Sequence, residues 1–142
     1  MSNSFYGVIV LLFQIAAMVV GFIGIAQFSL NAALIYVAGI PVTFVIFVYA
    51  YCTKCPIRNN CVHVVHGLVA NLMPGREQGK YSWADILGAM TFFGFVCIFP
   101  QYWLLKNLTL LVMFWVIYLT GMSLNAIKLC HGCGNVDCIL RR

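Results

Sequence analysis

Six of the seven cysteines in this 142-residue chain fall into two groups of three, and each group begins with a C-x-x-C spacing. The groups are Cys52, Cys55 and Cys61, and Cys130, Cys133 and Cys138. A C-x-x-C turn lets two thiolates point at one metal while backbone N–H groups stabilise their negative charge. The spacing therefore predicts that these six cysteines are metal ligands.

The number of cysteines bears on which metal they would bind. A single tetrahedral zinc ion needs four ligands and would leave two of the six cysteines unused. Iron–sulfur clusters are held by cysteine thiolates, and a cluster at a membrane face suggests an electron route. We therefore expect an iron–sulfur centre of the [4Fe-4S] type, with zinc as the alternative. The seventh cysteine, Cys97, is expected to be a small buried apolar residue.

Three histidines are candidate cofactor-binding residues, namely His63, His66 and His131. They could supply further metal ligands, or they could form hydrogen bonds beside the cysteine site. His63 and His66 are three residues apart and would share one face of a helix. The apolar segment around them, residues 62–73, is too short to cross a membrane and predicts an interfacial or re-entrant helix. A membrane haem is disfavoured because no histidine lies in a long apolar segment.

The composition indicates which elements must position these residues. Hydrophobic residues make up 63% of the chain and charged residues only 8%, which is too little charge to cover a soluble globule. The same composition argues against a disordered chain, a coiled coil and a nucleic-acid-binding protein. The net charge of +5 is explained by loops beside a membrane. The sequence predicts an all-α integral membrane protein whose main partner is the lipid bilayer.

Four apolar segments are long enough to cross a bilayer as helices. They predict spans over residues 5–28, 31–51, 85–105 and 108–128. The chain is then a single membrane domain, 1–142, built as a four-transmembrane-helix bundle with a cysteine-rich loop at 52–84 and a cysteine-rich tail at 130–142. Ser82 or Asp85 is expected to cap the third helix.

The basic residues predict the orientation of these spans. Seven of the eight lie on the side that holds both termini and the 52–84 loop, whereas only Lys106 lies on the other side. The positive-inside tendency makes the crowded side cytoplasmic, in what we expect to be a prokaryotic cytoplasmic membrane with both termini inside. Since the cytoplasm is reducing, metal ligation is favoured over disulfides, which would require the inverted topology.

Two amide side chains interrupt the predicted spans, Gln14 in the first and Asn125 in the fourth. Interhelical hydrogen bonds are the simplest explanation for both. Contact with a headgroup or a substrate is the alternative.

The sequence contains no phosphate-binding loop, dinucleotide fingerprint or nucleophile–base arrangement, which disfavours an autonomous enzyme. We expect an electron-transfer subunit of a membrane oxidoreductase. It would carry electrons between a larger cytosolic or membrane redox subunit and the membrane quinone pool. A zinc-stabilised assembly or adaptor subunit without redox chemistry is one alternative. A membrane protein that handles soft metals or thiols is another.

Overall fold

The computed structural model describes residues 3–61, 63–77, 79–130, 133 and 135, and these residues form helices and connecting turns without strands. The α-helices are α1 (Asn3–Ala26), α2 (Leu30–Phe47), α3 (Val64–Leu72), α4 (Trp83–Ile98), α5 (Gln101–Leu104) and α6 (Leu108–Leu124). Four stretches are long and apolar enough to cross a membrane: Phe5–Ala26, Leu30–Cys52, Trp83–Leu104 and Leu108–Cys130. The predicted all-helical fold, with four helices long and apolar enough to cross a membrane, is thus confirmed.

The second and fourth spans end in wide π-helical turns, η1 (Val48–Cys52) after α2 and η3 (Asn125–Cys130) after α6. These turns carry the first cysteine of each group to the end of its span. The short helix that was expected around the histidines is present as α3. A single 3₁₀ turn, η2 (Arg58–Asn60), lies between η1 and α3.

The third span is interrupted near Pro100, where α4 ends and α5 begins. A proline has no backbone N–H, so the carbonyl four residues earlier, that of Val96, loses its helical partner. The Tyr36 hydroxyl on α2 donates a hydrogen bond of 3.3 Å to that carbonyl. The side-chain amide of Gln101 donates to the neighbouring carbonyl of Cys97 at 2.6 Å. The polar backbone freed by the break is therefore satisfied inside the apolar interior.

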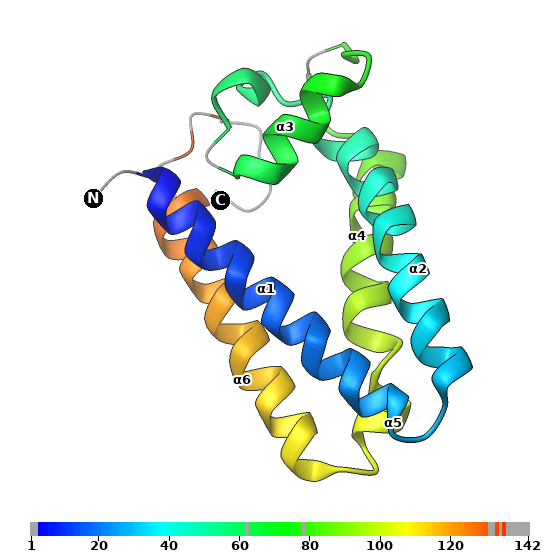
Figure 1. Cartoon of the computed structure of the whole chain (residues 1–142). Coiled ribbons are helices and arrows are strands. Elements are labelled where there is room, and N and C mark those ends of the chain that lie inside the picture. The colour runs from blue at the N-terminus through cyan, green and yellow to red at the C-terminus, as the bar shows by residue number, and fades with distance from the viewer. Residues whose placement is uncertain (1–2, 62, 78, 131–132, 134, 136–142) are drawn as a thin grey trace.

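The four spans are arranged as two pairs, α1 with α6 and α2 with α4. Small residues allow both pairs to pack closely. A Cβ added to Gly121 would lie 2.9 Å from Cβ of Phe13 on α1, and one added to Gly88 would lie 2.6 Å from Cβ of Ala50 in η1. The pairs converge at the end that holds α5 and diverge toward the end that holds α3, so that the molecule is V-shaped (Figure 1).

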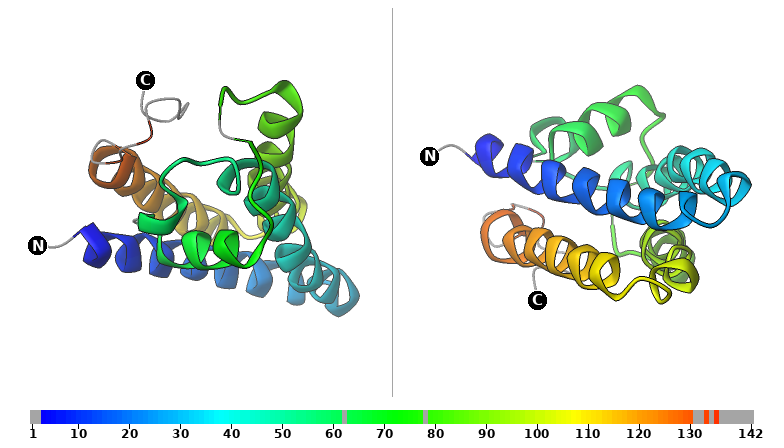
Figure 2. Two further views of the ribbon diagram at one scale, coloured as in Figure 1. Left: turned by 90° about the horizontal axis from the view of Figure 1, so that it is seen from above. Right: turned by 60° about the horizontal axis from the view of Figure 1, so that its bottom comes forward.

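Aromatic packing holds the narrow end of the V together. The ring of Tyr36 stacks on Phe95 and Phe99 of the third span at 5.8 and 5.7 Å between centroids. Buried Ile25 and Ala33 complete this cluster. At the wide end, α3 lies across the opening and contacts α1, η1 and η2 (Figure 2). The start of α1 and the end of η3 lie at this same end, as predicted for helices that leave the membrane on one side.

Candidate functional site

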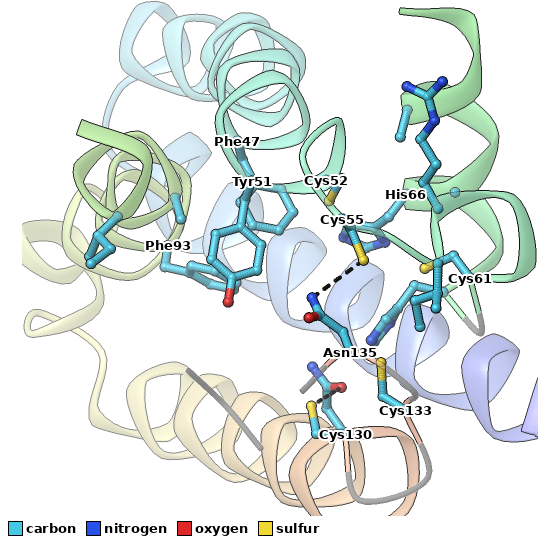
Figure 3. A pocket seen from close by; sticks show the side chains of 18 of the residues that line it. Phe47, Tyr51, Cys52, Cys55, Cys61, His66, Phe93, Cys130, Cys133 and Asn135 are labelled. Atoms are coloured by element: carbon cyan, nitrogen blue, oxygen red, sulfur yellow. Dashed lines mark hydrogen bonds between the residues drawn. The ribbon is translucent and has the colours of Figure 1, made fainter. Parts of the chain in front are cut away.

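A cavity of about 360 Å³ lies at the wide end of the V, between the two helix pairs and beneath α3. Its walls include all five described members of the two cysteine groups and both described histidines: Cys52, Cys55, Cys61, Cys130, Cys133, His63 and His66. Figure 3 shows the cysteine side chains gathered around this space. Cys138 and His131, which were predicted to belong to the same site, lie outside the described residues.

Both C-x-x-C segments adopt the same turn. The N–H of Cys55 donates to the carbonyl of Cys52 at 3.1 Å, and the N–H of Cys133 donates to the carbonyl of Cys130 at 3.2 Å. Both cysteines of each pair line the same cavity. The tight turn expected from the spacing is therefore present twice.

Cys61 is held near the first turn by its contact with α3. A Cβ added to Gly67 would lie 2.8 Å from Cβ of Cys61, so only glycine lets the chain approach α3 this closely. Burial raises the pKa of the Cys61 thiol, and the negative charge of Cys55 and Cys133 raises this pKa further. A hydrogen bond from the backbone of His63 lowers the same pKa but does not cancel the effect of burial. Because the three sulfurs repel one another as thiolates, a bound cation would favour their joint deprotonation.

Asn135 connects the two cysteine segments. Its amide nitrogen donates to Sγ of Cys55 at 3.4 Å and to the hydroxyl of Tyr81 at 3.1 Å, and its side chain is only 2% exposed. Tyr81 in turn stacks on Tyr51 at 4.1 Å between ring centroids. Sequence reasoning missed Asn135, although its place between Cys133 and Cys138 was a usable signal, since N–H donors to sulfur commonly surround metal thiolates.

A buried carboxylate fixes the first cysteine turn to the start of α4. Asp85 is 2% exposed and accepts hydrogen bonds from Lys54 at 3.0 Å, Arg76 at 2.7 Å and the Ser82 hydroxyl at 2.9 Å. Ser82 and Asp85 also form a reciprocal capping box, which confirms the predicted cap. Lys54 lies inside the Cys52–Cys55 turn, so this network fixes the position of that turn.

The two described histidines contact each other and the aromatic residues of α2. Their rings are 5.2 Å apart, and the ring of His66 lies edge-on to Phe44 and Phe47 at 5.2 and 5.5 Å. Burial lowers the pKa of His63; burial, with a smaller contribution from His63, lowers that of His66 to about 3. Both imidazoles are therefore neutral at pH 7 and retain a nitrogen that can accept a proton or a metal.

The described sulfurs line the wall of the cavity and do not meet at one point. Within the part of the chain that the structure describes, no three His, Cys, Asp or Glu side chains are gathered as a single metal ion requires. Cys97 is absent from the lining and is half-buried in α4. It therefore lies away from the cavity that the other described cysteines border, and it is only partly buried where full burial was expected.

The cavity continues from the cysteines into the membrane-spanning region. Aromatic and apolar side chains of α2, η1 and α4 form one wall there, and Figure 3 shows Phe47, Tyr51 and Phe93 together on this side. Gln14 of α1 and Asn125 of η3 contribute to the opposite wall. Among the described residues neither amide forms the expected interhelical hydrogen bond, since Asn125 accepts from Cys130 at 3.5 Å and Gln14 has no partner. No sequence signal pointed to this apolar extension.

Comparisons of the chain with protein-family models, with curated proteins and with solved structures gave no match.

Proposed function

We propose that this protein is a membrane electron-transfer subunit whose cysteines hold an iron–sulfur centre at the wide end of the V. The observation that carries the proposal is that every described cysteine of the two groups borders one cavity, although the groups are separated by about 70 residues. Cys52, Cys55, Cys130 and Cys133 would be four thiolate ligands. Cys61, Cys138 and the histidines His63, His66 and His131 would complete or surround the site.

The separation of the described sulfurs favours a cluster over a single ion. Four thiolates around one zinc ion each lie about 2.3 Å from the metal and leave no space between them. Here the cysteines are spread along the wall of a cavity whose total volume, about 360 Å³, includes its extension into the membrane-spanning region, so the described sulfurs are separated and are not gathered around one ion-sized point. The donor set also fits, because thiolates are the ligands that such clusters prefer. When bound, the cluster accepts and releases one electron at a time.

The surrounding side chains would adjust the electron affinity of such a centre. The N–H of Asn135 points at Sγ of Cys55. Lys54 lies between Cys52 and Cys55 in the sequence, with its ammonium bound to Asp85 and to the carbonyl of Lys80. Hydrogen-bond donors and positive charges near the sulfurs stabilise the reduced, more negative state. Asp85 offsets part of this charge, because it binds both Lys54 and Arg76.

Electrons would pass between a cytosolic redox subunit and the membrane quinone pool. Reduction of one quinone to its quinol takes two electrons, delivered one at a time, and two protons from water. On the loop side, Lys80 is exposed and forms no ion pair within the described residues, whereas Arg58 lines the cavity and its Nη1 is buried. We infer that a negatively charged partner docks there, with an affinity that falls as salt rises.

A zinc-stabilised assembly subunit is the second candidate, and one observation favours it. The site lies where the two helix pairs diverge, so a metal held by both cysteine turns would connect the α2 end to the α6 end. Such a metal would stabilise the arrangement of the two helix pairs without any redox chemistry.

Anaerobic purification separates these functions. For the electron-transfer subunit we expect a brown protein with iron and acid-labile sulfide, a broad visible absorption that dithionite bleaches, and a paramagnetic signal after reduction. A colourless protein with zinc as its only metal would show that the electron-transfer function is wrong and that the assembly function applies.

A further inference from the structure

The cavity reaches far into the membrane-spanning region. Phe93 lines it and lies ten residues after the first residue of α4, Trp83, which corresponds to about 15 Å along the helix axis. The hydrocarbon core of a bilayer is about 30 Å thick. The deep end of the cavity is therefore near the middle of the membrane, where water is scarce.

The two walls of this deep part differ in chemistry. Phe47 and Phe93, from the α2–α4 pair, present aromatic side chains, and Tyr51 lies on the same side nearer the cysteines. The wall from the α1–α6 pair presents the amides of Gln14 and Asn125. A ligand that lies between them would meet ring surfaces on one side and hydrogen-bond donors on the other.

Both amides have unused hydrogen-bonding capacity. Asn125 is only 6% exposed. Its Oδ1 accepts a hydrogen bond from Sγ of Cys130, whereas its Nδ2 has no acceptor within the described residues. Gln14 is half-buried and has no hydrogen-bond partner in the same part of the chain. An unpaired amide in an apolar surrounding is costly, which makes a polar ligand group the expected partner.

The two amides lie at different depths. Gly121 packs against Phe13, the neighbour of Gln14, and Asn125 follows Gly121 by one helical turn toward the cysteines. One turn is about 5 Å along the axis, on the order of the separation between the two carbonyl oxygens of a para-quinone. Each amide could therefore donate to one carbonyl.

Met90 of α4 lies on the cavity wall at a level within a membrane-spanning segment, and 63% of its surface is exposed. A ligand with a long apolar tail could therefore place its head group inside and leave its tail in the bilayer.

We propose that this deep part of the cavity binds the head group of a lipophilic quinone, with Gln14 and Asn125 donating to its two carbonyl oxygens. The site rests on the proposed function, because it places the quinone beside the cysteines that would hold the redox centre. The aromatic wall contacts the ring, and the tail leaves past Met90.

The test is quinone binding to the purified full-length chain in detergent, with decylubiquinone and a methylated naphthoquinone as probes, measured by equilibrium dialysis and by native mass spectrometry. We expect saturable binding of one quinone per chain. Gln14→Leu and Asn125→Leu should each weaken it by about tenfold, the effect of losing one hydrogen bond. Ala89→Phe, which adds a ring to the cavity wall, should abolish it.

Gln27→Leu is the matched control, because it makes the same change in the turn between α1 and α2, outside the cavity lining. It should bind quinone as well as the unmodified chain does. The proposal would be overturned if the unmodified chain bound no quinone, or if Gln14→Leu and Ala89→Phe bound quinone as tightly as the unmodified chain does. Co-purified phospholipid that quinone does not displace would also overturn it. Gln14-dependent quinone binding to a protein that carries only zinc would support the quinone site and disprove the electron-transfer function. An iron–sulfur protein that binds no quinone would support the iron–sulfur centre and disprove the quinone site.

Discussion

Asn135 donates a hydrogen bond of 3.4 Å to Sγ of Cys55 across 80 residues of sequence. One partner follows η3, at the end of the α1–α6 pair, and the other follows η1, at the end of the α2–α4 pair. The bond thus joins the two sides of the V at the point where they are farthest apart, and it places an N–H donor on a candidate ligand.

The first prediction concerns this donor. Asn135→Ala should lower the reduction potential of the bound centre by about 40 mV, because loss of an N–H···S bond removes about 1 kcal/mol of stabilisation from the more negative reduced state. A redox titration followed by electron paramagnetic resonance measures the shift. Asn71→Ala, on the exposed side of α3, should leave the potential unchanged. An unchanged potential in Asn135→Ala would show that the bond does not tune the centre.

The second prediction concerns the ligands. Single Cys→Ser changes at Cys52, Cys55, Cys130 and Cys133 should each reduce the bound metal, because every turn needs both of its thiolates to hold its share of the site. Metal content per chain after gel filtration is the measurement. Cys97→Ser, the same change away from the cavity, should retain full metal. Full retention in all four ligand variants would contradict a shared site.

The third prediction concerns the buried carboxylate. Asp85→Asn should destabilise the protein by about 3 kcal/mol, because it leaves Lys54 and Arg76 without their common counter-ion in a largely buried position. Unfolding in mixed detergent micelles, followed by circular dichroism, measures the change. We also expect faster loss of metal, since Lys54 lies within the first cysteine turn. Glu77→Gln, at an exposed position of the same loop, is the control and should alter neither property.

The fourth prediction concerns pH. The pKa of Cys61 is raised, mainly by burial, so this residue is a neutral thiol at pH 7 and a metal must displace its proton. The affinity of the metal-free protein for Cd²⁺ should therefore still be rising at pH 9, where an ordinary thiol is already largely ionised. Competition titrations between pH 6 and 10, done without oxygen, give the slope. Cys61→Ser should show a shallower rise, and identical slopes would exclude Cys61 as a ligand.

The fifth prediction concerns topology. Reporter domains inserted at Gly79 and fused to the C-terminus should both report the cytoplasm, because seven of the eight basic residues lie on that side. Gly79 suits insertion, since it is exposed and nothing lies within 4 Å of a Cβ built there. A periplasmic signal at either position would invert the topology and with it the argument for reduced cysteines.

Several features follow from the sequence alone because they depend on local physics. Uncharged runs of about 20 residues must be helical in lipid, where each backbone group needs a partner within its own segment. The C-x-x-C turns, the Ser82–Asp85 cap and the short helix over His66 depend on spacings of three or four residues, which are also local. Four spans place the exits of the second and fourth helices at one end, and so the location of both cysteine groups at that end was predictable from connectivity.

Other features are decided only by the tertiary structure. The spans are apolar on every face, so no periodicity of the sequence indicates that α1 pairs with α6, that α2 pairs with α4, or that the pairs diverge. The hydroxyl of Tyr36 donates to the carbonyl of Val96, which Pro100 leaves without a helical partner, across 60 residues of sequence. Asn135 donates to Cys55 across 80 residues. The apolar extension beside Gln14 exists because aromatic rings close the narrow end of the V while the wide end stays open. Such long-range pairings depend on which packed surfaces fit one another in three dimensions, and the residue types alone are compatible with many of them.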